Sequence, residues 1–171
     1  IPSCAAMVAE RKVMQQANQA IAVARSQQAP VIHVKVAFSG DYIECPEHSP
    51  VFSAAKKYRA LELGSWGTEF HADMDLQPSH HVMVKHRISA YYATPLAAIL
   101  DAQQVREVVL AGVSTNMAIE STARELHDRG FIVTVLDDAC AAADIETHRA
   151  SLKNLARCAS VMTVAEWAEK I

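Results

Sequence analysis

The sequence lacks the glycine-rich patterns that hold phosphate groups. It contains neither GxxxxGK[ST] nor GxGxxG, and Gly112 has no second glycine near it. In such loops several glycines allow the backbone amides to approach a phosphate closely. A role in binding nucleotides or dinucleotides therefore has little support, and we expect no cofactor.

Close metal-ligand pairs and disulfide patterns are missing as well. The four cysteines form no CxxC pair, and the eight histidines form neither HExxH nor an Asp-x-His pair. Structural zinc sites usually contain such pairs. His80 and His81 lie at a predicted strand start and alternate faces, so at most one points inward. We expect no metal site, and we expect reduced thiols.

Long apolar runs and an excess of one charge are also absent. No stretch approaches the ~18 apolar residues of a membrane span. The net charge is only -3, which gives no electrostatic footprint for nucleic acid. No signal peptide is visible, although the chain opens at Ile1 without a methionine. We expect a cytoplasmic protein that binds a small molecule rather than a nucleic acid or a membrane.

What the 171 residues do contain is a regular alternation of strand and helix patterns. The spacing of apolar residues predicts helices over Met7–Arg25, Val51–Leu63, Leu96–Gln103, Thr115–Arg129, Ile145–Arg157 and Val164–Lys170. β-branched runs predict strands over Val31–Phe38, His80–Arg87, Val108–Leu110, Phe131–Leu136 and Ser160–Thr163, with a turn at Asp137–Ala143. This order predicts one α/β domain, residues 1–171, with three α/β/α layers and a doubly wound, mostly parallel sheet.

The start of the chain is unusual for such a fold. Doubly wound folds usually open on a strand at the centre of the sheet, whereas this chain opens on a predicted helix. We therefore expect a further strand before Ile1, which would bring the sheet to about six strands.

The segment Val108–Arg124 is the predicted active site. It joins a strand to a helix through Ala111–Gly112, and a helix start stabilises negative charge. Ligands in open α/β sheets bind beyond the carboxyl ends of the strands, where this turn lies. The segment contains no cysteine, which is its main puzzle.

A serine triad is one alternative for this segment. Gly112–Asn116 is close to GxSxG, and Ser114, Asp137 or Asp138, and His148 follow the chain order of an α/β-hydrolase triad. Asn116 replaces the second glycine, and the chain is short for that fold. These two departures favour an interpretation without a triad.

Lys85 is the strongest charged candidate. It lies at the carboxyl end of a predicted strand, where a lysine can point into the ligand crevice or simply reach solvent. In the crevice it would neutralise a carboxylate or activate a thiol. Trp66 and Tyr91 lie in turns nearby and are candidates to close a pocket, with core packing as the alternative. Cys45, in a polar loop, is interpreted as an inert cysteine.

Three stretches together resemble the isochorismatase-like (cysteine hydrolase) family: Lys85–Thr94, Val109–Arg124 and Asp137–Ala142. This family includes nicotinamidases, N-carbamoyl amide hydrolases, ureidoacrylate hydrolases and isochorismatases. The resemblance covers nearly the whole chain and implies a central parallel sheet of about six strands. It also implies association into dimers or larger homo-oligomers.

The resemblance implies a catalytic set of an aspartate, a lysine and a cysteine. The aspartate would lie at the end of a strand before Ile1, Lys85 matches the lysine, and Ala118 stands at the cysteine position. A cis peptide is implied at Val113–Ser114, with an oxyanion hole formed by the amides of Ser114 and Ala118. Asn116 belongs to the same substrate-binding turn. The metal-binding Asp-x-His of nicotinamidases has no match at residues 33–36, which disfavours a nicotinamidase.

Ala118 decides the mechanism that is expected. A methyl group cannot attack a carbonyl, so hydrolysis through a thioester is excluded for this chain. Three explanations follow: a hydrolase that works without a thiol, a cysteine amidohydrolase inactivated by an engineered Cys→Ala, or a binding or assembly protein without catalysis. The leading hypothesis is a hydrolase that cleaves a C–N or vinyl-ether bond of a small, carboxylate-bearing metabolite, with Lys85 as the electrostatic partner of the acid.

Overall fold

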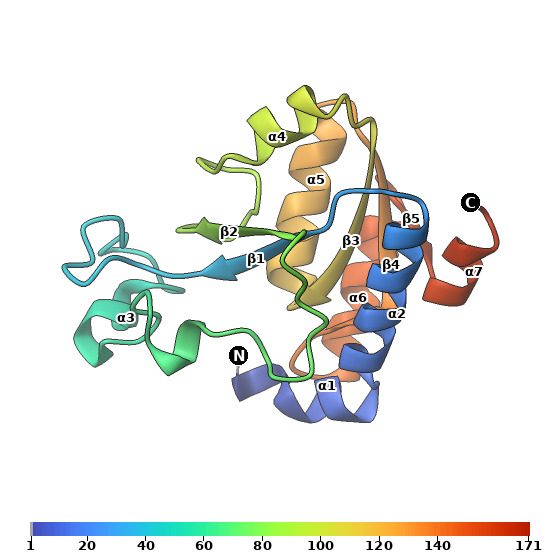
Figure 1. Cartoon of the computed structure of the whole chain (residues 1–171). Helices are drawn as coiled ribbons and strands as arrows, with labels where there is room; N and C mark the ends of the chain where they lie inside the picture. Colours follow the sequence, from blue (N-terminus) through green and yellow to red (C-terminus); the bar gives the residue numbers. More distant parts are fainter. Residues whose placement is uncertain (1) are drawn as a thin grey trace.

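The computed structural model describes residues 2–171, which form alternating helices and strands (Figure 1). The helical elements are η1 (Pro2–Cys4), α1 (Ala5–Glu10), α2 (Val13–Ser26), α3 (Ser53–Tyr58), η2 (Trp66–Thr68), α4 (Leu96–Ala102), the π-helix η3 (Thr115–Ile119), α5 (Glu120–Asp128), α6 (Ile145–Leu155) and α7 (Val164–Ala168). The strands are β1 (Ile32–Val36), β2 (His81–Lys85), β3 (Glu107–Val113), β4 (Ile132–Ala141) and β5 (Ser160–Met162).

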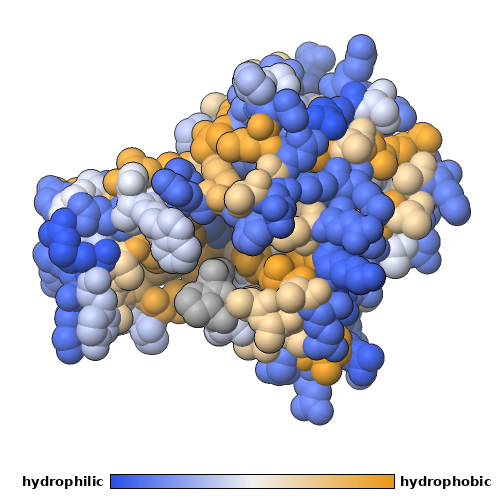
Figure 2. Space-filling view, turned by 60° about the horizontal axis from the view of Figure 1, so that its bottom comes forward, coloured by the Kyte–Doolittle hydropathy of each residue, from blue (hydrophilic) through white to orange (hydrophobic). Residues whose placement is uncertain are grey.

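All strand pairs are parallel, which confirms the predicted α/β class. The described residues form two sheets instead of one: β1 pairs with β2, and β3, β4 and β5 pair in that order. One edge of β1 and one edge of β3 therefore have no strand partner among residues 2–171. Apolar side chains reach the surface in the hollow between the part that contains α3 and the rest of the molecule (Figure 2).

Helices cover both faces of the three-stranded sheet because its apolar residues alternate in direction. Val133 and Val135 of β4 point to one face and join a core with Leu126 of α5 and Leu155 of α6. Leu136 faces the other side, in a core that α2 and α7 complete. The three layers expected from the sequence are therefore present.

Two predicted helices differ from the observed ones. The segment predicted as one helix over Met7–Arg25 forms α1 and α2, separated where Lys12 adopts a left-handed conformation with φ of 53°. The predicted helix Val51–Leu63 contracts to α3, because Arg59 and Leu61 are also left-handed. Single residues in this conformation interrupt the helical hydrogen-bond ladder.

The region predicted as a turn at Asp137–Ala143 also differs, because β4 continues to Ala141. Leu110 pairs with Val135 but Gly112 pairs with Cys140, so β4 carries extra residues between these pairs. Such a bulge redirects side chains and is frequent beside functional sites. Here the bulge contains Asp137, whose side chain accepts a hydrogen bond from His148.

The excursion between β1 and β2 has a small core of its own. This excursion core consists of Phe38, Tyr42, Cys45, Phe52 and Ala55, all buried. The same excursion carries exposed apolar residues, including Ile43, Tyr58 and Trp66. None of the helices formed by residues 2–171 has the length and apolar character needed to cross a bilayer.

Candidate active site

Lys85 is the last residue of β2 and is buried, with 5% of its surface exposed. Met83 lies on the same face of β2 and is also buried. Val82 lies on the opposite face and is 51% exposed, as the alternation of side chains along a strand requires. The Lys85 ammonium donates a hydrogen bond to the carbonyl of Ile88. Burial lowers the pKa of Lys85 from 10.5 to about 8. The strand-end lysine therefore does not simply extend into solvent.

The segment after Lys85 is attached to the helix that starts beside Ala118. Ser89 Oγ donates to Glu125 Oε2 at 2.5 Å, and the amide of Ala90 donates to Thr122 Oγ1 at 2.9 Å. Thr122 Oγ1 in turn donates to the carbonyl of Ala118 at 2.6 Å. These bonds bring the neighbourhood of Lys85 and the turn that contains Ala118 together, although they lie far apart in the sequence.

The turn predicted at Ala111–Gly112 is wrong, because β3 continues to Val113 and Gly112 pairs with Cys140; the chain turns between Val113 and the π-helix. Gly112 has φ of +130°, a conformation that L side chains rarely adopt. The peptide between Val113 and Ser114 is cis, at the position that the resemblance implies. The carbonyl of Ser114 then accepts hydrogen bonds from the amides of Met117 and Ile119, both at 3.2 Å. π-Helical turns are rare and occur frequently at functional sites.

Cys140, which lies near the turn, cannot replace the nucleophilic thiol that position 118 lacks. Cys140 pairs with Gly112 across the sheet and is completely buried. Burial raises the pKa of the Cys140 thiol to about 12, so the nucleophilic thiolate is not populated near neutral pH. Cys45 is also buried, and its sulfur donates to the carbonyl of Phe52 at 3.3 Å, which fits the expected structural role.

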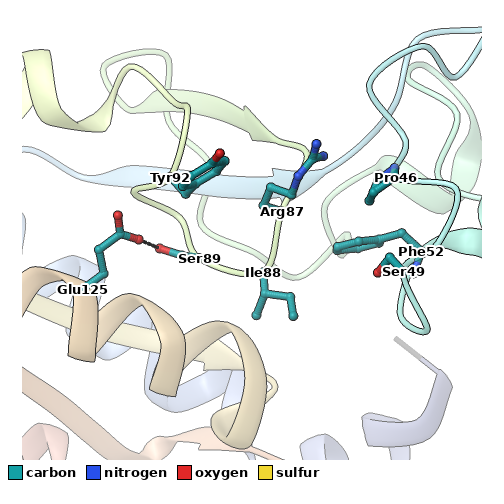
Figure 3. Close-up of a pocket in the computed structure, with 8 residues that line it drawn as sticks. All are labelled: Pro46, Ser49, Phe52, Arg87, Ile88, Ser89, Tyr92 and Glu125. Atoms are coloured by element: carbon teal, nitrogen blue, oxygen red, sulfur yellow. Dashed lines mark hydrogen bonds between the residues drawn. The ribbon is translucent and has the colours of Figure 1, made fainter.

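A cavity of about 470 Å³ opens beside the segment that follows Lys85 (Figure 3). It is lined by Pro46, Ser49, Phe52, Arg87, Ile88, Ser89, Tyr92 and Glu125. Glu125 is paired with Arg129 at 3.0 Å as well as with Ser89. Since Glu125 is already neutralised by Arg129, Arg87 leaves the cavity with a net positive character that suits an anionic ligand.

The two aromatic residues proposed as pocket walls do not line this cavity. Trp66 is 87% exposed in η2. Tyr91 packs against the core, with the Arg129 guanidinium 4.2 Å above the centre of its ring. The next residue, Tyr92, lines the cavity instead, because neighbouring side chains in this segment point to different sides. The sequence prediction named Tyr91, whereas its neighbour Tyr92 lines this cavity.

The serine triad, which the sequence analysis disfavoured, is not formed. His148 Nδ1 is 2.8 Å from Thr115 Oγ1, and His148 Nε2 is 2.9 Å from Asp137 Oδ1, so the histidine contacts Thr115 and not Ser114. Asn116 is exposed at the beginning of the π-helix. The sequence pattern found His148 and Asp137, but it missed Thr115. Residues 2–171 contain no cluster of three or more His, Cys, Asp or Glu side chains arranged to hold a metal ion.

Comparisons with known proteins agree with this geometry. The pattern of the family described as Isochorismatase domain matches residues 3–166. The isochorismatase family protein YecD of Escherichia coli O157:H7, described as uncharacterized, is 33% identical over 91% of this chain and 81% of its own length. The ureidoacrylate amidohydrolase RutB of Acinetobacter baylyi is 29% identical over 85% of this chain, but this chain spans only 64% of that enzyme. The fold resembles that of a cysteine hydrolase from Pseudomonas syringae pv. phaseolicola, with a TM-score of 0.85, 24% identity, and coverage of 92% of this chain and 78% of the other.

Proposed function

Since the chain belongs to the isochorismatase family, we propose that it is a hydrolase of a small, carboxylate-bearing metabolite that works without a covalent thioester. The observation that carries this proposal is Lys85. A lysine that is 5% exposed, at the carboxyl end of a parallel strand, is costly to bury unless it has a task. Its pKa of about 8 keeps the ammonium available at neutral pH to face a negative charge.

In the proposed reaction the turn and Lys85 stabilise charge while water is the nucleophile. The Ala118 methyl group cannot attack, so the chain forms no acyl-enzyme at this position. For a C–N bond, water adds to the carbonyl carbon, the amides of Ser114 and Ala118 donate hydrogen bonds to the oxyanion that forms, and the C–N bond breaks as the oxyanion collapses and the amine leaves. The resemblance implies a carboxylic acid that takes a proton from the water and gives one to the leaving amine, with Lys85 as its electrostatic partner.

The cavity supports the proposed substrate class. Arg87 lines the cavity, and its Nη1 already donates to the carbonyls of Glu44 and His86, so a carboxylate would pair with the other nitrogens of the guanidinium. Phe52 and Tyr92 provide apolar surface for the rest of a small molecule. Ile88, whose carbonyl accepts the Lys85 hydrogen bond, lines the same cavity, whereas Lys85, Ser114 and Ala118 are not among its lining residues. Because relatives are named ureidoacrylate amidohydrolases, ureido acids are the first compounds to test.

The experiment is a hydrolysis screen over ureido acids, including ureidoacrylate, and over vinyl-ether carboxylates such as isochorismate. The unaltered chain is compared with Lys85→Met and with Lys153→Met, an exposed lysine on α6 that serves as the matched control. We expect turnover that Lys85→Met lowers by about 100-fold or more, the scale of one lost electrostatic donor, whereas Lys153→Met leaves it unchanged. Equal turnover in both variants would contradict the role of Lys85.

A second candidate function, a binding protein without catalysis, is favoured by Ala118 alone. Calorimetry with the same compounds separates the two: binding without hydrolysis would support the binding protein. Ala118→Cys is informative here. Activity that appears only in this variant would show that the frame supports thiol chemistry and would contradict the thiol-free mechanism.

We also propose that copies of the chain associate. Ile43, Tyr58 and Trp66 are 81%, 69% and 87% exposed on the excursion that carries α3. Large apolar side chains gathered on one region are typical of interfaces. Light scattering of the unaltered chain and of Trp66→Ser is the test; a monomer in both would contradict the proposal.

A further inference from the structure

A chain of hydrogen bonds, partly exposed at Asp137 and buried at His148 and Thr115, extends from the amino-terminal helices to the active-site turn. Arg11, between α1 and α2, contacts Asp137 Oδ1 at 2.6 Å and donates to the carbonyl of Asp137 at 2.9 Å. Asp137 accepts from His148 Nε2 at 2.9 Å, and His148 Nδ1 is 2.8 Å from Thr115 Oγ1. The hydrogen bond from His148, followed by Arg11, lowers the pKa of Asp137.

The direction of these bonds can be deduced from the ionised carboxylate. Asp137 can only accept, so His148 Nε2 carries the proton that is shared with it. In the neutral imidazole Nδ1 is then an acceptor, and the Thr115 hydroxyl donates to it. Thr115 is thereby held in one rotamer at the first residue of the π-helix.

This arrangement resembles a nucleophile, a base and an acid, but burial excludes nucleophilic attack by Thr115. Thr115 is 0% exposed and His148 is 1% exposed. A substrate cannot reach Oγ1, which distinguishes the group from an accessible catalytic triad. The hydroxyl can act only through the backbone that carries it.

That backbone is the turn between Ser114 and Ala118, and α6 braces it at two points. His148 contacts Thr115, and Ser151, three residues later on the same face of α6, donates to Glu120 Oε2 at 2.6 Å. One contact is at Thr115, the first residue of the π-helix, and the other is at Glu120, the residue directly after it. A π-helical turn has poorer intrinsic stability than an α-helix, so external contacts of this kind fix its geometry.

We propose that Thr115 and His148 are positioning residues that set the geometry of the Ser114–Ala118 turn and thereby the strength of its anion site. The inference rests on the proposed function for the use of that turn. Its consequence can be measured without any substrate. A thiol introduced at position 118 reports on the turn, because amides at a helix start stabilise a thiolate.

The experiment uses Ala118→Cys and follows alkylation of that thiol by iodoacetamide against pH, with peptide mass spectrometry to separate it from the native cysteines. We expect Thr115→Val in this background to raise the thiol pKa and to slow alkylation at neutral pH by about tenfold, which corresponds to one pH unit. Thr115→Ser keeps the hydroxyl and should restore the rate. Thr163→Val is the matched control, because it removes a hydroxyl that caps α7 and forms no hydrogen bond with Thr115, His148 or Asp137.

A rate in Thr115→Val equal to that in Thr163→Val would overturn the proposal. If Thr115→Val does not fold, amide hydrogen exchange in the unaltered chain decides. The amides of Met117 and Ile119, which donate to Ser114, should be protected as strongly as those of α5. If these two amides exchanged about 100-fold faster than those of α5, the proposal that α6 fixes the turn would be refuted. Failure to find hydrolysis of any compound would contradict the proposed function and leave these two measurements unchanged.

Discussion

Replacing Lys85 with methionine should make the protein more stable near neutral pH and should change how its stability depends on pH. In the folded chain the Lys85 pKa is about 8, against 10.5 for an unburied lysine. The folded state therefore binds this proton about 300-fold more weakly than the unfolded state does. This difference lowers the free energy of unfolding at neutral pH by about 3.4 kcal/mol. Methionine fills a similar volume without the charge, but it loses the hydrogen bond to Ile88, which is worth about 1 kcal/mol. The net gain expected at pH 7 is about 2 kcal/mol.

The sign of the pH dependence follows from the proton balance. Below pH 8 both states are protonated and the folded state carries the full cost of the buried charge. Between pH 8 and 10.5 the unfolded state retains the proton that the folded state has released, so stability rises with pH. In Lys85→Met this rise disappears, whereas the other titrating groups affect both proteins equally.

Urea unfolding of the unaltered chain, Lys85→Met and Lys153→Met provides the measurement, at pH 7 and at about pH 9.5. We expect the unaltered chain to gain about 2 kcal/mol of unfolding free energy relative to Lys85→Met over this interval, and the same gain for Lys153→Met. An identical response of all three proteins to pH would show that the pKa of Lys85 is not depressed.

Three further predictions concern the surroundings of the site. Thr122→Val removes the acceptor of the Ala90 amide and should cost about 1–3 kcal/mol in urea unfolding, whereas Thr122→Ser should be nearly neutral; equal costs would refute this. Asp137→Asn should be destabilising at pH 7 and much less so near pH 3, because a lowered pKa contributes stability that is lost as the carboxylate is protonated; a pH-independent difference in unfolding midpoint would contradict the assignment. Cys140 should react with iodoacetamide at pH 8 at least about 100-fold more slowly in the folded than in the unfolded protein, as mass spectrometry can show; comparable rates would show that its thiol is neither buried nor raised in pKa.

The sequence was sufficient for features that depend on local pattern. Alternating strand and helix signals predicted the α/β class, and the spacing around Lys85 placed it at a strand end. Strand and helix formation depends on periodicity within a few residues, which is visible in the chain itself. Features that depend on distant partners were not visible. The interruption at Lys12 accompanies the contact of its neighbour Arg11 with Asp137, more than one hundred residues away in the chain.

The candidate site shows the same division. The turn around Ser114 could be located because a strand, a glycine and a helix start follow one another. Which hydroxyl His148 contacts could not be deduced, because the two candidate residues are adjacent and their directions depend on the backbone around the turn. Trp66 was misassigned since an aromatic residue in a turn can point to solvent or into a cavity with equal local cost. The division of the strands into two sheets depends on pairing, which periodicity does not encode.

The excursion core has an evolutionary consequence. Phe52 belongs to that core and, with Pro46 and Ser49, forms one wall of the cavity, while Lys85 is held by β2 and by the segment that docks on α5. Substitutions that reshape this wall mainly change the packing of the excursion core. The packing of the strands that hold Lys85 stays the same. Descendants of one ancestral chain could therefore diverge in the molecules they accept while they inherit the same charge-stabilising frame.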